Sequence, residues 1–226
     1  PQLRPGRSKL VYDEAADDQI TQTMTSSMFN FFSLAKEELL IQNAYVIPED
    51  DAIEYLQAWQ DAGVRVRLLT NSLASHDVPA VNSHYEPWRD DIVRAGVDLW
   101  EFRADPEIQS SVIDVAPVKA GFSGLHSKCA VADRRYVFIG SMNMDPRSRG
   151  INTEMGAMVD SPELAEDLAR IIERNMNGKN AWHVQIDDAG KLSWHSDTEV
   201  LDKQPARDSM QRVMNVIMKV GPKDQY

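Results

Sequence analysis

Four side chains with phosphate-binding chemistry occur in two pairs, each spaced two residues apart. His126 and Lys128 form the first pair, and Ser141 and Asn143 form the second. Residues two apart on a β-strand share a face, so the members of each pair would project together. An imidazole, an ammonium, a hydroxyl and an amide can all contact one oxyanion. A single histidine or lysine is usually a core or rim residue, but a buried ammonium needs an anion, so the pattern indicates a phosphate site.

Three predicted strands carry these residues. Apolar runs predict strands over Leu125–Ala132, Tyr136–Gly140 and Thr153–Val159. The turn Asp133-Arg134-Arg135 joins the first two strands. The second pair of side chains therefore follows the end of the strand next to the first pair.

Upstream of these strands, helix and strand signals alternate. An apolar stripe predicts a helix within 17–37, and 38–48 has the pattern of a strand. Residues 49–71 and 83–102 each repeat a helix, a terminating glycine and a strand. Such repetition favours parallel strands with crossover helices, and therefore a layered α/β sheet.

The downstream part begins with a helix over 160–178. Asp160 or Ser161 is its expected N-cap, with Pro162 in the first turn. Alternation on both sides of a glycine-containing turn predicts a hairpin over 181–196.

A last helix is predicted near 208–219. Its apolar stripe fits either packing on the domain or contact with a membrane surface. The stripe consists of Met210, Val213, Met214, Ile217 and Met218. We divide the chain into a catalytic core over 1–178 and an appendage over 179–226.

The composition is that of a folded domain. The 226 residues are 42% hydrophobic, and the net charge of −11 disfavours binding to nucleic acid. A phosphate-bearing small molecule or lipid head group fits better. The single cysteine permits no internal disulfide, and no apolar run has the length of a membrane span. The chain begins at Pro1 without a methionine, so we expect it to be part of a longer protein.

Around His126, Lys128, Ser141 and Asn143 the sequence resembles the phospholipase D superfamily. The segments 68–102 and 140–165 are also similar to the carboxy-terminal half of bacterial cardiolipin synthases. The resemblance implies a three-layer α/β/α sandwich with a mixed, mostly parallel sheet. The superfamily signature H-x-K-x4-D-x6-G-S-x-N is filled at every position, by His126, Lys128, Asp133, Gly140, Ser141 and Asn143.

The resemblance also implies roles for the site residues. His126 would be either the nucleophile that forms a phosphohistidine or the general acid and base. Lys128 and Asn143 would hold phosphoryl oxygens, with Ser141 in support. Glu154 occupies the place of a carboxylate that hydrogen-bonds the histidine, although a solvated strand-edge residue is the alternative.

Other residues have weaker signals. Asp133 belongs to the catalytic signature, yet its place in a turn leads us to expect that it holds that turn. Arg147 would bind a second phosphate or be an ordinary loop arginine. A third residue, His76, follows a predicted strand end and is a candidate for lining the pocket. The chemistry implied by the family requires no metal or other cofactor.

The chain carries only one copy of the signature. None of the other four histidines has a lysine two positions later, so half of a two-histidine site is expected. The other half would come from an amino-terminal lobe of the same protein, absent here, or from a second copy of this chain, which we favour less.

Three functions compete on this basis. The first is a phosphatidyltransferase of the cardiolipin synthase type, acting on phospholipids and bound peripherally to the cytoplasmic face of the bacterial inner membrane. The second is a dimeric phosphodiesterase or endonuclease with one signature in each chain. The third is a non-catalytic lobe, which the intact signature disfavours.

Overall fold

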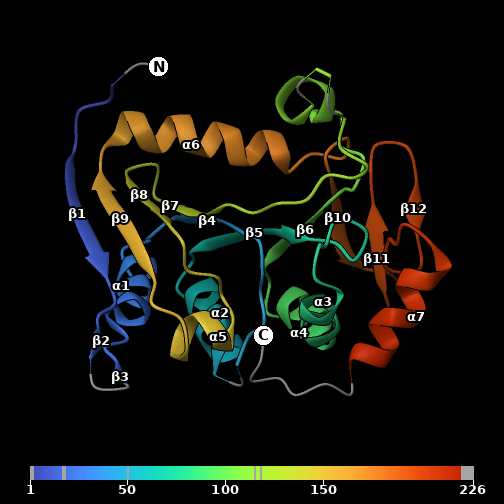
Figure 1. Ribbon diagram of the computed structural model, residues 1–226, viewed down its shortest axis with the longest axis horizontal. Helices are drawn as coiled ribbons and strands as arrows, with labels where there is room; N and C mark the ends of the chain where they lie inside the picture. The colour runs from blue at the N-terminus through green and yellow to red at the C-terminus, as the bar shows by residue number, and fades with distance from the viewer. Residues whose placement is uncertain (1–2, 17–18, 50, 115, 118, 220–226) are drawn as a thin grey trace.

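The computed structural model describes residues 3–16, 19–49, 51–114, 116–117 and 119–219. Their main feature is a mixed ten-stranded sheet with helices on both faces (Figure 1). In order across this sheet lie β1 (Arg7–Tyr12), β9 (Met155–Asp160), β8 (Tyr136–Gly140), β7 (Lys128–Ala132), β4 (Glu38–Asn43), β5 (Arg65–Asn71), β6 (Asp98–Phe102), β10 (Ala181–Ile186), β11 (Leu192–His195) and β12 (Val200–Leu201). The short strands β2 (Ala15–Ala16) and β3 (Gln19–Ile20) pair separately.

The helices follow the predicted segments with shorter bounds. They are α1 (Thr23–Phe32), α2 (Ala52–Asp61), α3 (Pro79–Tyr85), α4 (Arg89–Arg94), α5 (Pro146–Gly150), α6 (Pro162–Asn175) and α7 (Ser209–Met218). A 3₁₀ turn covers Glu86–Trp88, and a π-helical turn covers Gln109–Ile113.

The mixed sheet is confirmed, but the expectation that it is mostly parallel is wrong. Only β4, β5 and β6 run parallel to one another, and every other pairing in the large sheet is antiparallel. The helix and strand repeat that suggested parallel strands extends only to β6. After it, β7 and β8 are joined by the tight turn at 133–135, and a connection that short permits only an antiparallel pair.

The three layers appear clearly in Figure 1, where α6 covers one face of the sheet and α1, α2 and α4 cover the other. Two apolar cores correspond to these faces. Helix α6 contributes Ala165, Ala169 and Ile172 to one core, which also holds β7 and β8 residues. Helix α1 contributes Met24 and Phe31 to the other. The predicted sandwich is therefore the observed architecture.

A side-chain cap fixes where α6 begins, and α1 begins only after the short strand β3. The Ser161 hydroxyl accepts a hydrogen bond from the Leu164 N–H at 3.4 Å and caps α6, so Ser161 rather than Asp160 is the N-cap. Helix α1 starts at Thr23, because Ile20 lies in β3.

The segment after residue 178 continues the sheet. The predicted hairpin forms as β10 and β11, and β10 pairs with β6 of the central sheet. Helix α7 lies against α3, where Asn82 Nδ2 donates to Asn215 Oδ1 at 2.7 Å. The boundary at residue 178 stays a prediction.

The apolar stripe of α7 does not face α3. The helix buries Gln211 and Asn215, whereas Met210, Val213 and Ile217 are exposed. The packing interpretation of this stripe is therefore wrong for these three residues.

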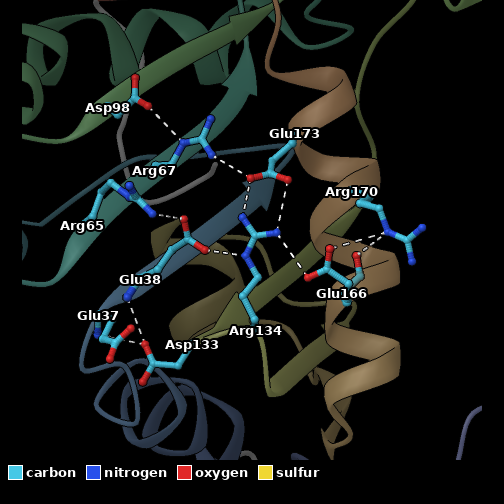
Figure 2. A network of polar contacts seen from close by, with 10 residues as sticks. All are labelled: Glu37, Glu38, Arg65, Arg67, Asp98, Asp133, Arg134, Glu166, Arg170 and Glu173. Carbon is cyan, nitrogen blue, oxygen red and sulfur yellow. Dashed lines mark hydrogen bonds and ion pairs between the residues drawn. The ribbon is translucent and has the colours of Figure 1, made fainter.

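A network of ion pairs lies where β4, β5 and β6 begin (Figure 2). Arg134 Nε donates to Glu38 Oε2 at 2.7 Å, and Arg134 also pairs with Glu173 of α6. Arg67 joins Glu173 to Asp98 at 3.2 and 3.1 Å. These pairs connect β4, β5, β6 and the turn after β7 to helix α6 on one face of the sheet.

Candidate active site

Apart from Asp133, the signature residues meet at the end of the sheet opposite to that ion-pair network. Strand β7 runs antiparallel to β4, so Lys128 at its start pairs with Asn43 at the end of β4. Residues 141–143 follow the end of β8, and Glu154 precedes β9. The antiparallel order therefore brings the two signature pairs together at the carboxyl ends of β4 and β8.

His126 and Lys128 differ in exposure. His126 lies just before β7 and is exposed, whereas Lys128 is buried with 7% of its surface accessible. Lys128 Nζ donates to the His126 carbonyl at 2.8 Å. Burial lowers the pKa of Lys128, and the nearby carboxylates of Glu154 and Asp145 oppose that shift. An ammonium held in this way can still donate to a phosphoryl oxygen.

Tyr45 forms a wall of the site that the sequence reasoning missed. Its ring lies edge-on to His126 at a centroid distance of 6.2 Å and 5.8 Å from Lys128 Nζ. The Tyr45 hydroxyl donates to Asp77 Oδ1 at 2.9 Å, and burial raises the pKa of the phenol. The available signal was its position two residues beyond the last residue of β4, where ligands collect in such sheets.

His76 lies against Tyr45, and its role in lining the pocket stays a prediction. The two rings stack at 5.3 Å with an interplanar angle of 22°. Burial lowers the pKa of His76 to about 4, so the ring is neutral at pH 7. Its Nδ1 has no hydrogen-bond partner among the described residues and lies 3.9 Å from Asp77 Oδ1.

Asn71 fixes the segment that carries His126. Its Nδ2 donates to the carbonyls of Ala44 and Leu125, both at 3.0 Å, and its Oδ1 accepts from the Leu125 N–H at 2.8 Å. Gly124 allows the close approach, because a Cβ there would lie 2.5 Å from the Ser75 carbonyl oxygen. Asn71 therefore acts as a positioning residue.

Ser141 and Glu154 hold each other. The Ser141 hydroxyl donates to Glu154 Oε2 and accepts from the Met155 N–H at 3.0 Å. Asn152 Nδ2 also donates to Glu154, at 3.3 Å. Glu154 is buried, so it is not a solvated edge residue, and within the described residues its partners do not include His126.

Asn143 has an amide group available to a ligand. Its backbone N–H donates to Ser148 Oγ at 3.2 Å, but its Oδ1 is buried without a partner among the described residues. Asp145 caps α5 by accepting from the Ser148 N–H at 2.7 Å, and burial raises the pKa of Asp145. Arg147 lies exposed on α5, close in sequence to Asn143.

Asp133 lies at the opposite end of β7, roughly 15 Å along the strand from Lys128. Its carboxylate accepts backbone N–H bonds from Lys36, Glu37 and Glu38 at 2.8 to 3.0 Å (Figure 2 shows the pairing with Glu37). Burial would raise the pKa of Asp133, but these donors outweigh it and lower that pKa. Asp133 therefore holds a turn and does not reach the site.

The arrangement can bind and attack a phosphodiester. We call His126, Lys128 and Asn143 the phosphate site. An exposed imidazole can reach phosphorus, while the ammonium and amide can hold phosphoryl oxygens. In the described ranges, no group of three or more His, Cys, Asp or Glu is placed to hold a metal ion.

Comparisons with known proteins identify the family of this chain. A family model described as cardiolipin synthase, PLD-like domain, matches residues 28–176. The chain is 34% identical over 200 residues to cardiolipin synthase C of Escherichia coli K12, a match that covers 86% of this chain and 42% of that protein. It is 23% identical over 175 residues to cardiolipin synthase B of the same strain, covering 77% of this chain and 37% of that protein. The chain thus spans less than half of either relative.

Solved structures share the fold. A phospholipase D family member, Nuc from Salmonella typhimurium, superimposes with a TM-score of 0.56 at 16% identity, covering 78% of this chain and 97% of that one. NucT from Helicobacter pylori gives a TM-score of 0.57 at 15% identity, covering 78% and 98%. With the family model and the E. coli relative, these findings show that the chain belongs to the phospholipase D-like domain family of the cardiolipin synthases.

Proposed function

We propose that this chain is the carboxy-terminal catalytic lobe of a phosphatidyltransferase that makes cardiolipin. The observation that carries the proposal is the exposed His126 imidazole beside the buried Lys128 ammonium, in a chain 34% identical to a cardiolipin synthase. A phospholipid donor and an alcohol on a second lipid are the substrates.

His126 acts at the phosphorus atom of the donor lipid. As nucleophile, its ring nitrogen forms a P–N bond while the P–O bond to the leaving alcohol breaks, and a second histidine gives that alcohol its proton. The acceptor alcohol then attacks phosphorus, the P–N bond breaks, and the acceptor's proton returns to the second histidine. In the alternative assignment, the two histidines exchange these roles.

The remaining site residues support this reaction. Lys128 and Asn143 hold the non-bridging oxygens, whose charge grows in the transition state. Ser141 and Glu154 support the site by holding each other through a hydrogen bond. Arg147, exposed on α5, binds a second phosphate.

The second histidine belongs to an amino-terminal lobe of the same protein. This chain matches only 42% of E. coli cardiolipin synthase C, which leaves length for another lobe. His126 is exposed and open to such a partner. The chain alone is then expected to fold yet to lack turnover.

The proposed place of action is the cytoplasmic face of the bacterial inner membrane, bound peripherally. No helix within the described ranges has the length and apolarity to cross a bilayer. The exposed side chains of Met210, Val213 and Ile217 on α7 supply an apolar surface for contact with lipid.

A dimeric phosphodiesterase or endonuclease is the second candidate. Nuc is covered over 97% of its chain, so one lobe of this fold can form an entire chain. In that arrangement two copies would place their His126 side chains around one phosphate. The net charge of −11 argues against a nucleic-acid substrate.

Lipid-product analysis tests the proposal. The protein that contains this lobe is incubated with phosphatidylglycerol vesicles, and the products are identified by mass spectrometry. Cardiolipin formation that Lys128→Met abolishes is the expected result. Phosphodiester hydrolysis by a homodimer of residues 1–226, with no lipid product, would establish the second candidate instead.

A further inference from the structure

An apolar cavity of about 80 Å³ lies directly beside the phosphate site. It runs between α1, α2 and one face of the sheet, and Asn143 and Asp145 form part of its wall. Asn143 therefore borders both the phosphate site and the cavity.

The cavity leads from the surface into the core. Phe29, Tyr55 and Arg149 lie at its outer side, where Tyr55 is 47% exposed. Arg149 pairs with Glu49 there, and its guanidinium lies 6.0 Å from the centre of the Phe29 ring. The inner wall consists of fully buried side chains, namely Ile41, Val66, Leu68 and Ile92.

The lining chemistry selects an aliphatic ligand. Most of the wall is carbon, supplied by residues such as Met28, Phe32 and Leu56. A water molecule there would find few of the polar partners that it needs, whereas apolar guests bind in cavities of this kind. The volume matches a few methylene groups rather than a whole chain.

We propose that this cavity holds part of one acyl chain of the lipid whose phosphate is bound by His126, Lys128 and Asn143. The inference rests on the proposed function, because it assigns the cavity to the same substrate. In a phospholipid the acyl chains join the glycerol that carries the phosphate. A phosphate site and an apolar cavity that share Asn143 match that connection.

Trp59 provides a direct readout of occupancy, since it lines the cavity. A phosphatidylglycerol with short, terminally brominated chains is added below its micelle concentration, and tryptophan fluorescence is recorded. The bromines should quench Trp59, and Trp59→Phe should lose most of the quenching although four other tryptophans remain. Equal quenching in the wild type and in Trp59→Phe would overturn the proposal.

A matched pair of substitutions on α2 tests the location. Ala52 lines the cavity, whereas Ala58 is exposed and does not. Ala52→Leu should weaken binding of the brominated lipid about tenfold, and Ala58→Leu should leave it within about twofold. Thr25→Leu fills the cavity from α1. It replaces Ala52→Leu in this test if Ala52→Leu lowers the thermal midpoint of unfolding. Unchanged affinity in folded Ala52→Leu or Thr25→Leu overturns the proposal.

Failure of the proposed function would look different. Quenching that Ala52→Leu weakens, in a protein that transfers no phosphatidyl group, supports the acyl site and contradicts the transferase. Lipid turnover together with equal quenching in the wild type and in Trp59→Phe contradicts the acyl site but not the transferase.

Discussion

Charged and polar groups lie at both ends of β7, but only those at the Asp133 end have their full set of hydrogen-bond partners. At the Asp133 end, the Asp133 carboxylate accepts three backbone N–H bonds, and Arg134 bridges Glu38 and Glu173. At the Lys128 end, the ammonium donates to a backbone carbonyl, and Asn143 Oδ1 has no partner within the described part of the chain.

This difference separates stability from chemistry. At the Asp133 end, the polar groups bind one another and fix a turn and the ends of the neighbouring strands. They have no free donor or acceptor to offer a ligand. The Lys128 ammonium has three N–H donors and gives one of them to the His126 carbonyl, so it can still donate to a bound phosphate. Substitutions at the Asp133 end should therefore affect unfolding, and those at the Lys128 end should affect turnover.

The largest expected effect is at His126. His126→Ala removes the reacting imidazole, so turnover of the two-lobe protein should fall by at least about a thousandfold. The thermal midpoint should stay unchanged because the side chain is exposed. His195→Ala, on the distant strand β11, is the control and should retain full turnover. Activity within a few-fold of wild type in His126→Ala would end the assignment.

The next effect concerns pH and the buried His76. Its pKa in the folded state is about 4, below the ordinary 6.5, so the unfolded chain takes up the proton first as pH falls. The contribution of neutral His76 to the free energy of unfolding is therefore fully present above pH 6.5. It is lost as pH falls towards 4, by about 3 kcal/mol in total. Urea unfolding across that range measures the slope. His76→Gln should flatten it, and an equally steep slope in that variant would contradict the interpretation.

At the other end of β7, Asp133→Ala should cost stability without slowing the chemistry. The change leaves three backbone N–H groups without their acceptor and puts alanine at a φ of +50°, for a loss of roughly 2 kcal/mol. Asp133→Asn keeps an acceptor and a side chain that tolerates this φ, so it should lose less. A drop in kcat at unchanged stability would place Asp133 in the reaction instead.

The smallest effect is expected at Tyr45. Tyr45→Phe removes the bond to Asp77 but keeps the ring beside His126, so turnover should fall only about two- to threefold. Tyr45→Ala also removes the ring and should cost about tenfold. Equal losses in both variants would show that the hydroxyl, rather than the ring, is what the site needs.

Much of the site could be predicted because its residues are close in sequence. His126 lies two residues before Lys128, the first residue of β7, and Ser141 and Asn143 follow the end of β8, which a short turn joins to β7. Their spacing alone indicated that each pair belongs to one site. The turn role of Asp133 followed from its position after the strand. By contrast, Tyr45 follows the end of another strand, β4, more than eighty residues before Lys128, and no local pattern joins the two.

Glu154 and α7 show more clearly what could not be predicted from the sequence. Glu154 was expected beside His126, but the Ser141 hydroxyl takes one of its oxygens. Helix α7 turns its apolar residues outward and buries Asn215, because Asn82 and Glu86 offer hydrogen bonds to that amide. In each case a polar partner on another element decided the orientation, 13 residues away for Glu154 and 133 residues away for Asn215.

The amino-acid order was therefore sufficient for the signature, the strand and helix alternation, and the charge that disfavours a polyanion. These features depend on residue type and on spacing within a few residues. The antiparallel pairing of β7 with β4 and of β10 with β6, the Tyr45 and His76 stack and the cavity beside Asn143 depended on how distant segments pack. Chain connectivity and side-chain volume settle such contacts, and a periodic pattern along one element carries no information about which element lies against it.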